Sequence, residues 1–516
     1  MTKTAHLFCS TALVLAMAPQ YATADVTADD VWQNQQDYMA TLGGDLTTSA
    51  VRNGDTLSIS DVALAYQLPF DMGSLTFSLV GFSMTEQGDG TVAITYATPT
   101  TIGFAVEIAE QGSFSGNVDF SMQGYVNIAS GAPGDVTYEW SVDRMGFQSR
   151  DIELHPKKPT DDQPKVVTLT AAGSVSDMSG TTRVAVAELV STDSSYSFGR
   201  QDFTFGGEAD DGRFTYKSGA DGVTGFGKLA LPRNGMDIMN LAAALREGLA
   251  YTGETKTTGY HTSQITEEND VVVSSQSSRV VEQTGQYALD NSGLRMKGTV
   301  VDAEMEMQPG AELPFLLRLQ VEEASGGMTL PLSAGAELQD VAFDFLLEGL
   351  TMAEDMWALF DPQQTLPRDP MTIKMDLLAK VLNKVDWLDF LTVKAVMDSG
   401  EVPVELHEMT LNDLRVDIAG AQLTGSGAGR FDNSDLESLD GFPKPIGVID
   451  LALKGGNGLL DSLVAMGLLS DEDAMGARMA TAVFTTPDPD TGADVLKSRL
   501  EMTEEGYVLA NGQRLK

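Results

Sequence analysis

The chain has 516 residues, and its 74 acidic against 33 basic side chains give a formal charge of −41. Such a surface repels nucleic acid and anionic lipid head groups and favours cations or basic partners, so nucleic acid is excluded as a partner. The only cysteine, Cys9, lies in the leader described below. The exported chain therefore has no thiol for a disulfide, a metal site or a nucleophile. Its length allows a core that needs no disulfides.

Residues 1–24 have the order of a secretory signal. Lys3 supplies the positive start, residues 7–18 form an apolar or small-residue run, and Ala22-Thr23-Ala24 matches a cleavage pattern. We expect cleavage between Ala24 and Asp25 and export to the bacterial periplasm, with secretion or the outer membrane as lesser alternatives. No later segment approaches the roughly 20 apolar residues of a transmembrane helix.

In most of the exported chain, apolar residues alternate with polar or small ones, as in antiparallel β-strands with one solvent-exposed face. The clearest runs are Leu75-Phe77-Leu79, Val92-Ile94-Tyr96, Val136-Tyr138-Trp140-Val142 and Val341-Phe343-Phe345-Leu347. Hairpin turns are expected at 52–55, 87–90 and 290–293. The apolar phase changes between Ile59 and Val62, which predicts a β-bulge near Ser60-Asp61.

Four helical pieces are expected among the strands. The first, over 27–42, begins at Thr27 and ends at Gly43-Gly44; the second covers 236–249. The third, over 351–361, begins with Thr351-Met352-Ala353-Glu354, the pattern of a capping box with Thr351 as N-cap. The fourth is a helical hairpin over 459–484 with Ser470 as the second cap. Together these features predict a mainly β (α+β) fold. Residues 25–516 would form one elongated domain, with a long, bent antiparallel sheet shaped into an open groove.

Catalytic patterns are missing from the sequence. The exported chain has three histidines, His155, His261 and His407, and His407-Glu408 lacks the second histidine of a metalloprotease helix. No serine lies in the Gly-x-Ser-x-Gly elbow of hydrolases or three residues before a lysine. We therefore expect no catalytic residue, no cofactor and no enzymatic activity.

Two segments suggest ligand sites but depart from the required patterns. In Gly425-Ser426-Gly427-Ala428-Gly429-Arg430, arginine replaces the third glycine of a dinucleotide loop, so a bend or close strand packing is the better interpretation. Asp488, Asp490 and Asp494 form a weak calcium candidate. Gly492 and Ala493 interrupt the ligand series, and Arg499 replaces the bidentate glutamate, so an acidic turn is preferred.

Several segments together resemble a known family. They are Ala24-Asp25-Val26-Thr27 with Trp32, Leu366-Pro367-Arg368-Asp369-Pro370, Leu423-Thr424-Gly425-Ser426-Gly427 with Phe431-Asp432-Asn433-Ser434, Gly455-Gly456-Asn457-Gly458-Leu459-Leu460-Asp461 with Met466-Gly467-Leu468-Leu469, and the closing Gly506-Tyr507-Val508-Leu509-Ala510-Asn511-Gly512-Gln513. In these the chain resembles the exported alphaproteobacterial family catalogued as domain of unknown function 2125. The resemblance implies export and a β-rich build, with no catalytic residues to transfer.

Three functions are compatible with these features. The first is a non-catalytic periplasmic protein that binds a hydrophobic ligand such as lipid, or supports envelope assembly with another envelope protein. The second is an outer-membrane β-barrel porin, which the predicted helical hairpin at 459–484 disfavours. The third is a carbohydrate hydrolase that uses two carboxylates, whose spatial separation a sequence does not reveal.

Overall fold

The computed structural model describes residues 25–68, 72–156, 168–209, 212–310, 316–436, 441–487 and 494–515. These residues form a mainly β protein with 26 strands and six helices, and its strands pair antiparallel. The chain divides into two compact units, residues 1–275 and 276–516. The predicted cleavage at Ala24 involves a residue outside the described part of the chain. Within that part, no helix combines the length and apolarity needed to cross a membrane.

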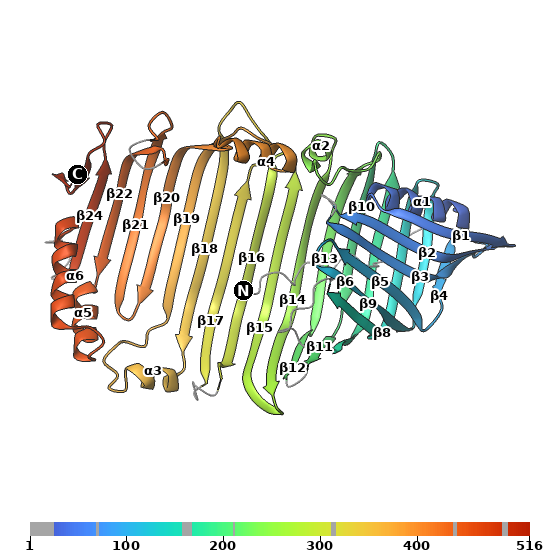
Figure 1. Ribbon diagram of the computed structural model, residues 1–516, viewed down its shortest axis with the longest axis horizontal. Coiled ribbons are helices and arrows are strands. Elements are labelled where there is room, and N and C mark those ends of the chain that lie inside the picture. Colours follow the sequence, from blue (N-terminus) through green and yellow to red (C-terminus); the bar gives the residue numbers. More distant parts are fainter. Residues whose placement is uncertain are drawn as a thin grey trace. The chain divides into compact units, whose positions relative to one another are not determined.

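The first unit is built from fourteen complete strands and two helices (Figure 1). Its strands are β1 (Asp45–Asn53), β2 (Thr56–Leu68), β3 (Gly73–Glu86), β4 (Val92–Tyr96), β5 (Thr100–Ile108), β6 (Gly112–Gln123), β7 (Val126–Ala132), β8 (Asp135–Pro156), β9 (Thr168–Val186), β10 (Leu189–Phe198), β11 (Gln201–Ala209), β12 (Gly212–Ala220), β13 (Gly222–Pro232) and β14 (Ala250–Glu268). Its helices are α1 (Ala28–Thr41) and α2 (Leu241–Arg246). Strand β15 (Val271–Asp290) crosses the division between the units.

One arrangement of six strands occurs twice in this unit, in β3–β8 and again in β9–β14. In each set the long first strand pairs with the third strand along its first half and with the second strand along its second half. The second strand then pairs with the fifth and the third with the fourth. The fourth and fifth pair with opposite halves of the long sixth strand. This duplication is visible in the strand pairing.

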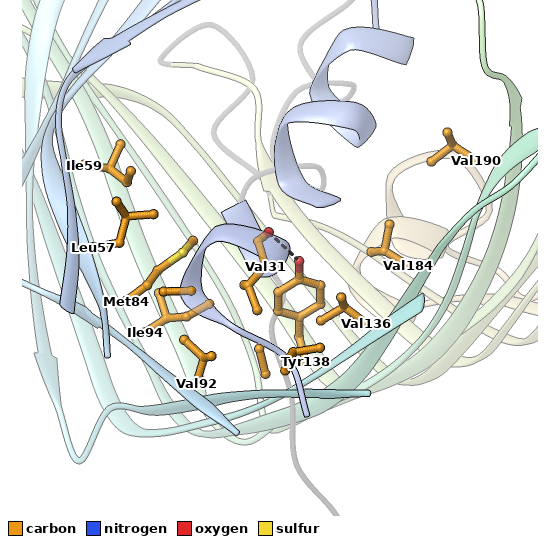
Figure 2. Packing of buried hydrophobic residues seen from close by; sticks show 13 residues of the cluster. Val31, Leu57, Ile59, Met84, Val92, Ile94, Val136, Tyr138, Val184 and Val190 are labelled. Carbon is orange, nitrogen blue, oxygen red and sulfur yellow. Dashed lines mark hydrogen bonds between the residues drawn. The ribbon is translucent and has the colours of Figure 1, made fainter. Parts of the chain in front are cut away.

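Helix α1 fills the main core of the first unit (Figure 2). Val31 on its inner face has no solvent exposure and lies among buried residues of β2, β3, β4, β7, β8, β9 and β10. The cluster consists of Val26, Ala28, Val31, Leu57, Ile59, Met84, Val92, Ile94, Ala129, Val136, Tyr138, Val184 and Val190. A helix of this length gains most of its stability from such burial, because isolated helices of about this length are marginal in water.

Polar contacts hold the start of α1. Thr27 and Asp30 form a capping box, and the carboxylate of Glu86 in β3 accepts from the amide of Ala28 at 3.0 Å. Arg52, at the end of β1, donates to both Glu86 and Asp29 at 2.6 Å. These bonds satisfy amides that a helix start leaves without partners and fix the helix against β1–β3.

The second unit contains β16 (Gly293–Gln308), β17 (Leu317–Leu330), β18 (Gln339–Met352), β19 (Met371–Asn383), β20 (Val404–Ile418), β21 (Ala421–Asp432), β22 (Lys444–Lys454), β23 (Thr486–Pro487), β24 (Val495–Met502), β25 (Val508–Ala510) and β26 (Gln513–Arg514). From β16 to β22 each strand pairs with the next along the chain, and β22 then pairs with β24. Its helices are α3 (Glu354–Phe360), α4 (Phe390–Ser399), α5 (Gly456–Ala465) and α6 (Asp471–Phe484). In Figure 1, α3 and α4 lie at opposite ends of the long strands, and α5 and α6 lie beside β24.

The strand predictions are confirmed in type and place. The four alternating runs lie in β3, β4, β8 and β18, and the three predicted turns join β1 to β2, β3 to β4 and β15 to β16. The predicted bulge is also confirmed, because Asp61 has φ 53° and the β1–β2 register shifts beside it. As a result Leu57 and Val62 lie on the same side of β2, where Val62 packs against the core.

The helix predictions are confirmed in part. Helix α1 begins after Thr27, and Ser470 caps α6 by accepting from the amide of Asp473. The helix expected over 236–249 is shorter, since only Leu241–Arg246 is helical after Asn240 as N-cap. The prediction of four helical pieces also missed α4, which has Asp389 as N-cap and Gly400 in the left-handed region at its end.

The predicted capping box at Thr351 is wrong. Thr351 is still in β18, where it pairs with Gln320 of β17, and α3 begins only at Glu354 with Ala353 as an N-cap that makes no side-chain bond. The backbone of Thr351 is therefore extended and part of the sheet. Replacing Thr351 should thus remove no helix cap.

Candidate ligand-binding faces

One face of the second unit's sheet is uncharged across eight strands. Facing residues of antiparallel strands project to the same side, so the register identifies three rows of side chains that run across β16–β22 and β24. The rows are Met296, Met328, Phe343, Leu377, Leu411, Gly427, Ile449 and Leu500; Gly298, Gly326, Phe345, Met375, Leu414, Gly425, Leu451 and Ser498; and Val300, Ala324, Leu347, Ile373, Val416, Leu423, Leu453 and Leu496. We call this set the unit-2 apolar face. Ser498 is its only polar member.

Part of the unit-2 apolar face is open to solvent. Phe343 and Phe345 of β18 are 39% and 37% exposed, and Ile373 of β19 is 38% exposed. These three residues occupy neighbouring positions in the three rows. A contiguous group of large exposed apolar side chains is uncommon on a soluble surface and marks an interaction site.

The other face of the same strands carries the charges. Asp344, Asp376 and Asp413 face one another across β18, β19 and β20, and Lys374 bonds Asp413 at 2.8 Å. Further along, Arg499 of β24 is paired with Asp450 of β22 at 3.0 Å. The sheet therefore has one face suited to water and one face suited to an apolar partner.

Helices α5 and α6 lie at the β22–β24 end of the unit-2 apolar face. A Cβ on Gly456, the first residue of α5, would come within 2.6 Å of the Leu453 side chain, so helix and face are in close contact. The Ser498 hydroxyl donates to the carbonyl of Phe484, the last residue of α6, at 2.7 Å. This contact gives the single polar member of the face a partner. The exposed residues lie instead on β18 and β19.

The first unit carries a similar uncharged face, which we call the unit-1 apolar face. Its facing residues are Tyr66, Leu75, Val106 and Phe114; Leu64, Phe77, Phe104 and Gly116; Val62, Leu79, Ile102, Val118 and Ser149; Phe120, Phe147, Gly173, Phe203 and Ser218; and Ala171, Phe205 and Tyr216. Because Val62 also packs against the core, α1 and this face lie on the same side of the sheet. Phe77 and Phe205 remain 39% and 42% exposed.

Glycines make room for aromatic rings on the unit-1 apolar face. A Cβ on Gly173 would lie 2.5 Å from the ring of Phe203 and 2.6 Å from that of Phe147, whose centroids are 5.8 Å apart. In the same way Gly116 leaves space for Phe104, and Gly207 for Phe214. Several of the 51 glycines are thus explained by this packing, since a glycine in a strand permits close approach by its neighbours.

A chain of aromatic rings extends from α1 into the sheet. Trp32, Phe82, Tyr96 and Tyr125 follow one another with centroid distances of 5.8, 5.4 and 5.6 Å. Burial raises the pKa of Tyr96 to about 12 and raises that of Tyr125 as well. Both hydroxyls therefore stay neutral at ordinary pH, which suits an apolar environment.

The histidines and the glycine-rich segment have structural surroundings. His261 lies in β14 with Nδ1 3.1 Å from the carbonyl of Gly259, and His407 lies in β20 with Nε2 3.3 Å from Glu405. Gly425–Arg430 lies within β21 rather than before a helix. A Cβ on Gly427 would be 2.4 Å from the carbonyl oxygen of Val448, so this glycine serves close strand packing, as predicted.

Of the calcium candidates, Asp488 and Asp490 lie outside the described residues, whereas Asp494 is placed. Its carboxylate accepts from the amides of Asn457 at 3.1 Å and Gly458 at 3.0 Å, at the start of α5. Burial opposes ionisation of Asp494, but these bonds and the Asn457 side chain hold its pKa below the ordinary value. Asp494, the residue just before β24, thus caps the N-terminus of α5. In the described part of the chain, no group of three potential metal ligands occurs.

The Leu366-Pro367-Arg368 segment forms a compact, hydrogen-bonded loop beside α3. Asp361 is buried and accepts from the amides of Thr365 and Leu366 at 2.8 and 2.9 Å and from Arg368 at 2.7 Å. The guanidinium of Arg368 lies 4.2 Å from the ring centroid of the buried Trp357. These contacts give the segment a structural role in the connection from α3 to β19.

No family model, no curated protein and no solved structure matches this chain. Membership of the family catalogued as domain of unknown function 2125 therefore stays a prediction. The two apolar faces are the strongest candidate for a functional site in the described residues. Sequence reasoning found single alternating strands but missed these faces, because continuity across strands depends on register.

Proposed function

We propose that this protein is a non-catalytic periplasmic protein that binds a hydrophobic ligand, specifically acyl-chain lipid, on its apolar sheet faces. The observation that carries the proposal is the unit-2 apolar face, whose three rows contain no charged residue. Acyl chains gain roughly 25 cal/mol for each Å² of apolar surface removed from water, and they need no directional partner. The only polar side chain of the face, Ser498, is already bonded to Phe484, so the face fits such a ligand.

The exposed positions support the same proposal. Phe343, Phe345 and Ile373 cost free energy while they face water, and a bound acyl chain would remove that cost. Methionine contributes to the same face through Met296, Met328 and Met375. Its unbranched thioether side chain adapts to partners of varying shape, which suits ligands with flexible chains.

The first experiment extracts the purified exported protein with organic solvent and analyses the extract by mass spectrometry. We expect lipid in amounts stoichiometric with the protein. Protein that is repeatedly free of lipid, and that takes up none when incubated with vesicles, would contradict lipid binding and leave the role of an envelope-assembly scaffold.

A matched pair of variants locates the site. Phe345→Glu places a charge on the unit-2 apolar face, whereas Leu378→Glu makes the same change on the opposite face of the neighbouring strand, where Leu378 is 45% exposed. We expect Phe345→Glu to lower the lipid content at least severalfold and Leu378→Glu to leave it unchanged. Equal losses in both variants would show that the unit-2 apolar face is not the binding surface.

A further inference from the structure

The charges around the unit-2 apolar face restrict the head group of the ligand. Three basic side chains on the same strands are bonded to carboxylates: Lys374 to Asp413 at 2.8 Å, Lys380 to Asp340 at 2.7 Å and Arg318 to Glu306 at 2.6 Å. Lys374 and Lys380 project from the face opposite the unit-2 apolar face and are already neutralised, so they attract an anionic head group only weakly.

The excess of acidic over basic side chains also disfavours an anionic head group. The chain carries −41 formal charges, and Asp344 and Asp376 lie on the opposite side of the strands that form the apolar face. A sheet is thin compared with a Debye length of about 30 Å at 0.01 M salt, so these carboxylates repel an anion bound on the other face. The repulsion falls as salt rises, since the Debye length is only about 8 Å at 0.15 M.

We infer that the unit-2 apolar face takes acyl lipids whose head group has no net negative charge. This inference rests on the proposed function and names its substrate class. The uncharged rows hold the acyl chains, and the surrounding acidic field selects against anionic head groups. Electrostatic selection of this kind discriminates between ligands that have the same apolar part.

The test uses the full exported chain, fluorescent phosphatidylcholine and fluorescent phosphatidylglycerol with identical acyl chains, and vesicles of phosphatidylcholine as donor. We expect about tenfold greater uptake of phosphatidylcholine at 0.01 M salt, which falls to within about twofold at 0.5 M because salt screens the repulsion. Equal uptake at low salt, or a preference for phosphatidylglycerol, would overturn the inference while lipid binding itself stands. Uptake of neither lipid would instead contradict the proposed function.

A variant separates charge from shape. Asp344→Asn with Asp376→Asn removes two carboxylates from the charged face and changes no residue of the unit-2 apolar face. We expect this double variant to raise phosphatidylglycerol uptake severalfold at 0.01 M salt and to leave phosphatidylcholine uptake unchanged. No change in the ratio of the two lipids would show that the acidic field does not select the head group. Phosphatidylcholine uptake by the same sample confirms that the variant is folded.

Discussion

The hydroxyl of Tyr138 in β8 donates to Oδ1 of Asn34 in α1 at 2.7 Å, and both side chains are buried. Asn34 in turn donates through Nδ2 to the carbonyl of Val184 in β9 at 3.1 Å. The two bonds link one helix to two strands inside an otherwise apolar cluster. Both hydrogen bonds matter for stability, because a buried polar group that loses its partner costs more free energy than the bond itself contributes.

Tyr138→Phe should destabilise the first unit by about 1–3 kcal/mol, since it leaves Oδ1 of Asn34 buried without its donor. Urea unfolding followed by tryptophan fluorescence measures the change, because Trp32 and Trp140 lie in or beside the two core clusters of this unit. The control is Tyr287→Phe, where the side chain is 44% exposed and a change within about 0.5 kcal/mol is expected. Equal effects of the two substitutions would show that the buried bond contributes nothing specific.

Gly173→Ala should also destabilise the first unit, by about 1–3 kcal/mol, through overpacking. The new methyl group would lie 2.5 Å from Phe203, 2.6 Å from Phe147 and 2.8 Å from the backbone oxygen of Asp202. Gly227→Ala is the matched control, because a Cβ there meets nothing closer than the Tyr251 ring at 3.6 Å. Thermal unfolding of both variants tests the idea that aromatic packing requires glycine; a stable Gly173→Ala protein would refute it.

Acid should weaken the attachment of α1 through Glu86. The bond from Arg52 and that from the amide of Ala28 hold the pKa of the Glu86 carboxyl below its ordinary value. A carboxyl with a depressed folded-state pKa stabilises the protein above its unfolded pKa, about 4.3, and this contribution is lost as pH falls through the folded value. Urea midpoints between pH 7 and pH 3 should therefore fall less steeply in Glu86→Gln than in the wild type.

The control for this pH series is Glu107→Gln, which changes an exposed carboxylate on β5. Its midpoint should follow the wild type at every pH. If Glu86→Gln also follows the wild type, the anchoring bonds of Glu86 do not contribute to stability.

Local features of this fold could be predicted from the sequence where one residue type determines the conformation. The phase change from Ile59 to Val62 requires an extra residue, and Asp61 supplies it in the left-handed region. Thr27 and Asp30 bond each other's amides at the start of α1, and the Ser470 side chain accepts from the amide of Asp473 at the start of α6. These interactions span three residues, so the sequence contains all the information they need.

Predictions from the sequence fail where pairing with a distant strand determines the backbone conformation or the alignment of side chains. The pattern from Thr351 to Glu354 fits a capping box, but pairing of Thr351 with Gln320 keeps the backbone extended. The duplicated strand arrangement and the unit-2 apolar face are likewise properties of register. Leu414 faces Met375 and Leu411 faces Leu377, both on the apolar face, only because a bulge in β20 shifts the register between Asp376 and Leu377. Alternation within each strand predicts the existence of an apolar side but not its alignment with the next.

Asp494→Ala distinguishes a helix cap from a calcium ligand. Because Asp494 accepts from the amides of Asn457 and Gly458, its loss should lower the stability of the α5–α6 region by about 1 kcal/mol, as loss of other caps does. Hydrogen exchange of the α5 amides measures this effect, which should be the same with calcium and with a chelator. Asp471→Ala, at the start of α6 and exposed, is the control and should leave the exchange of α5 unchanged. Protection of α5 that appears only with calcium, and disappears in Asp494→Ala, would establish the metal site instead of the cap.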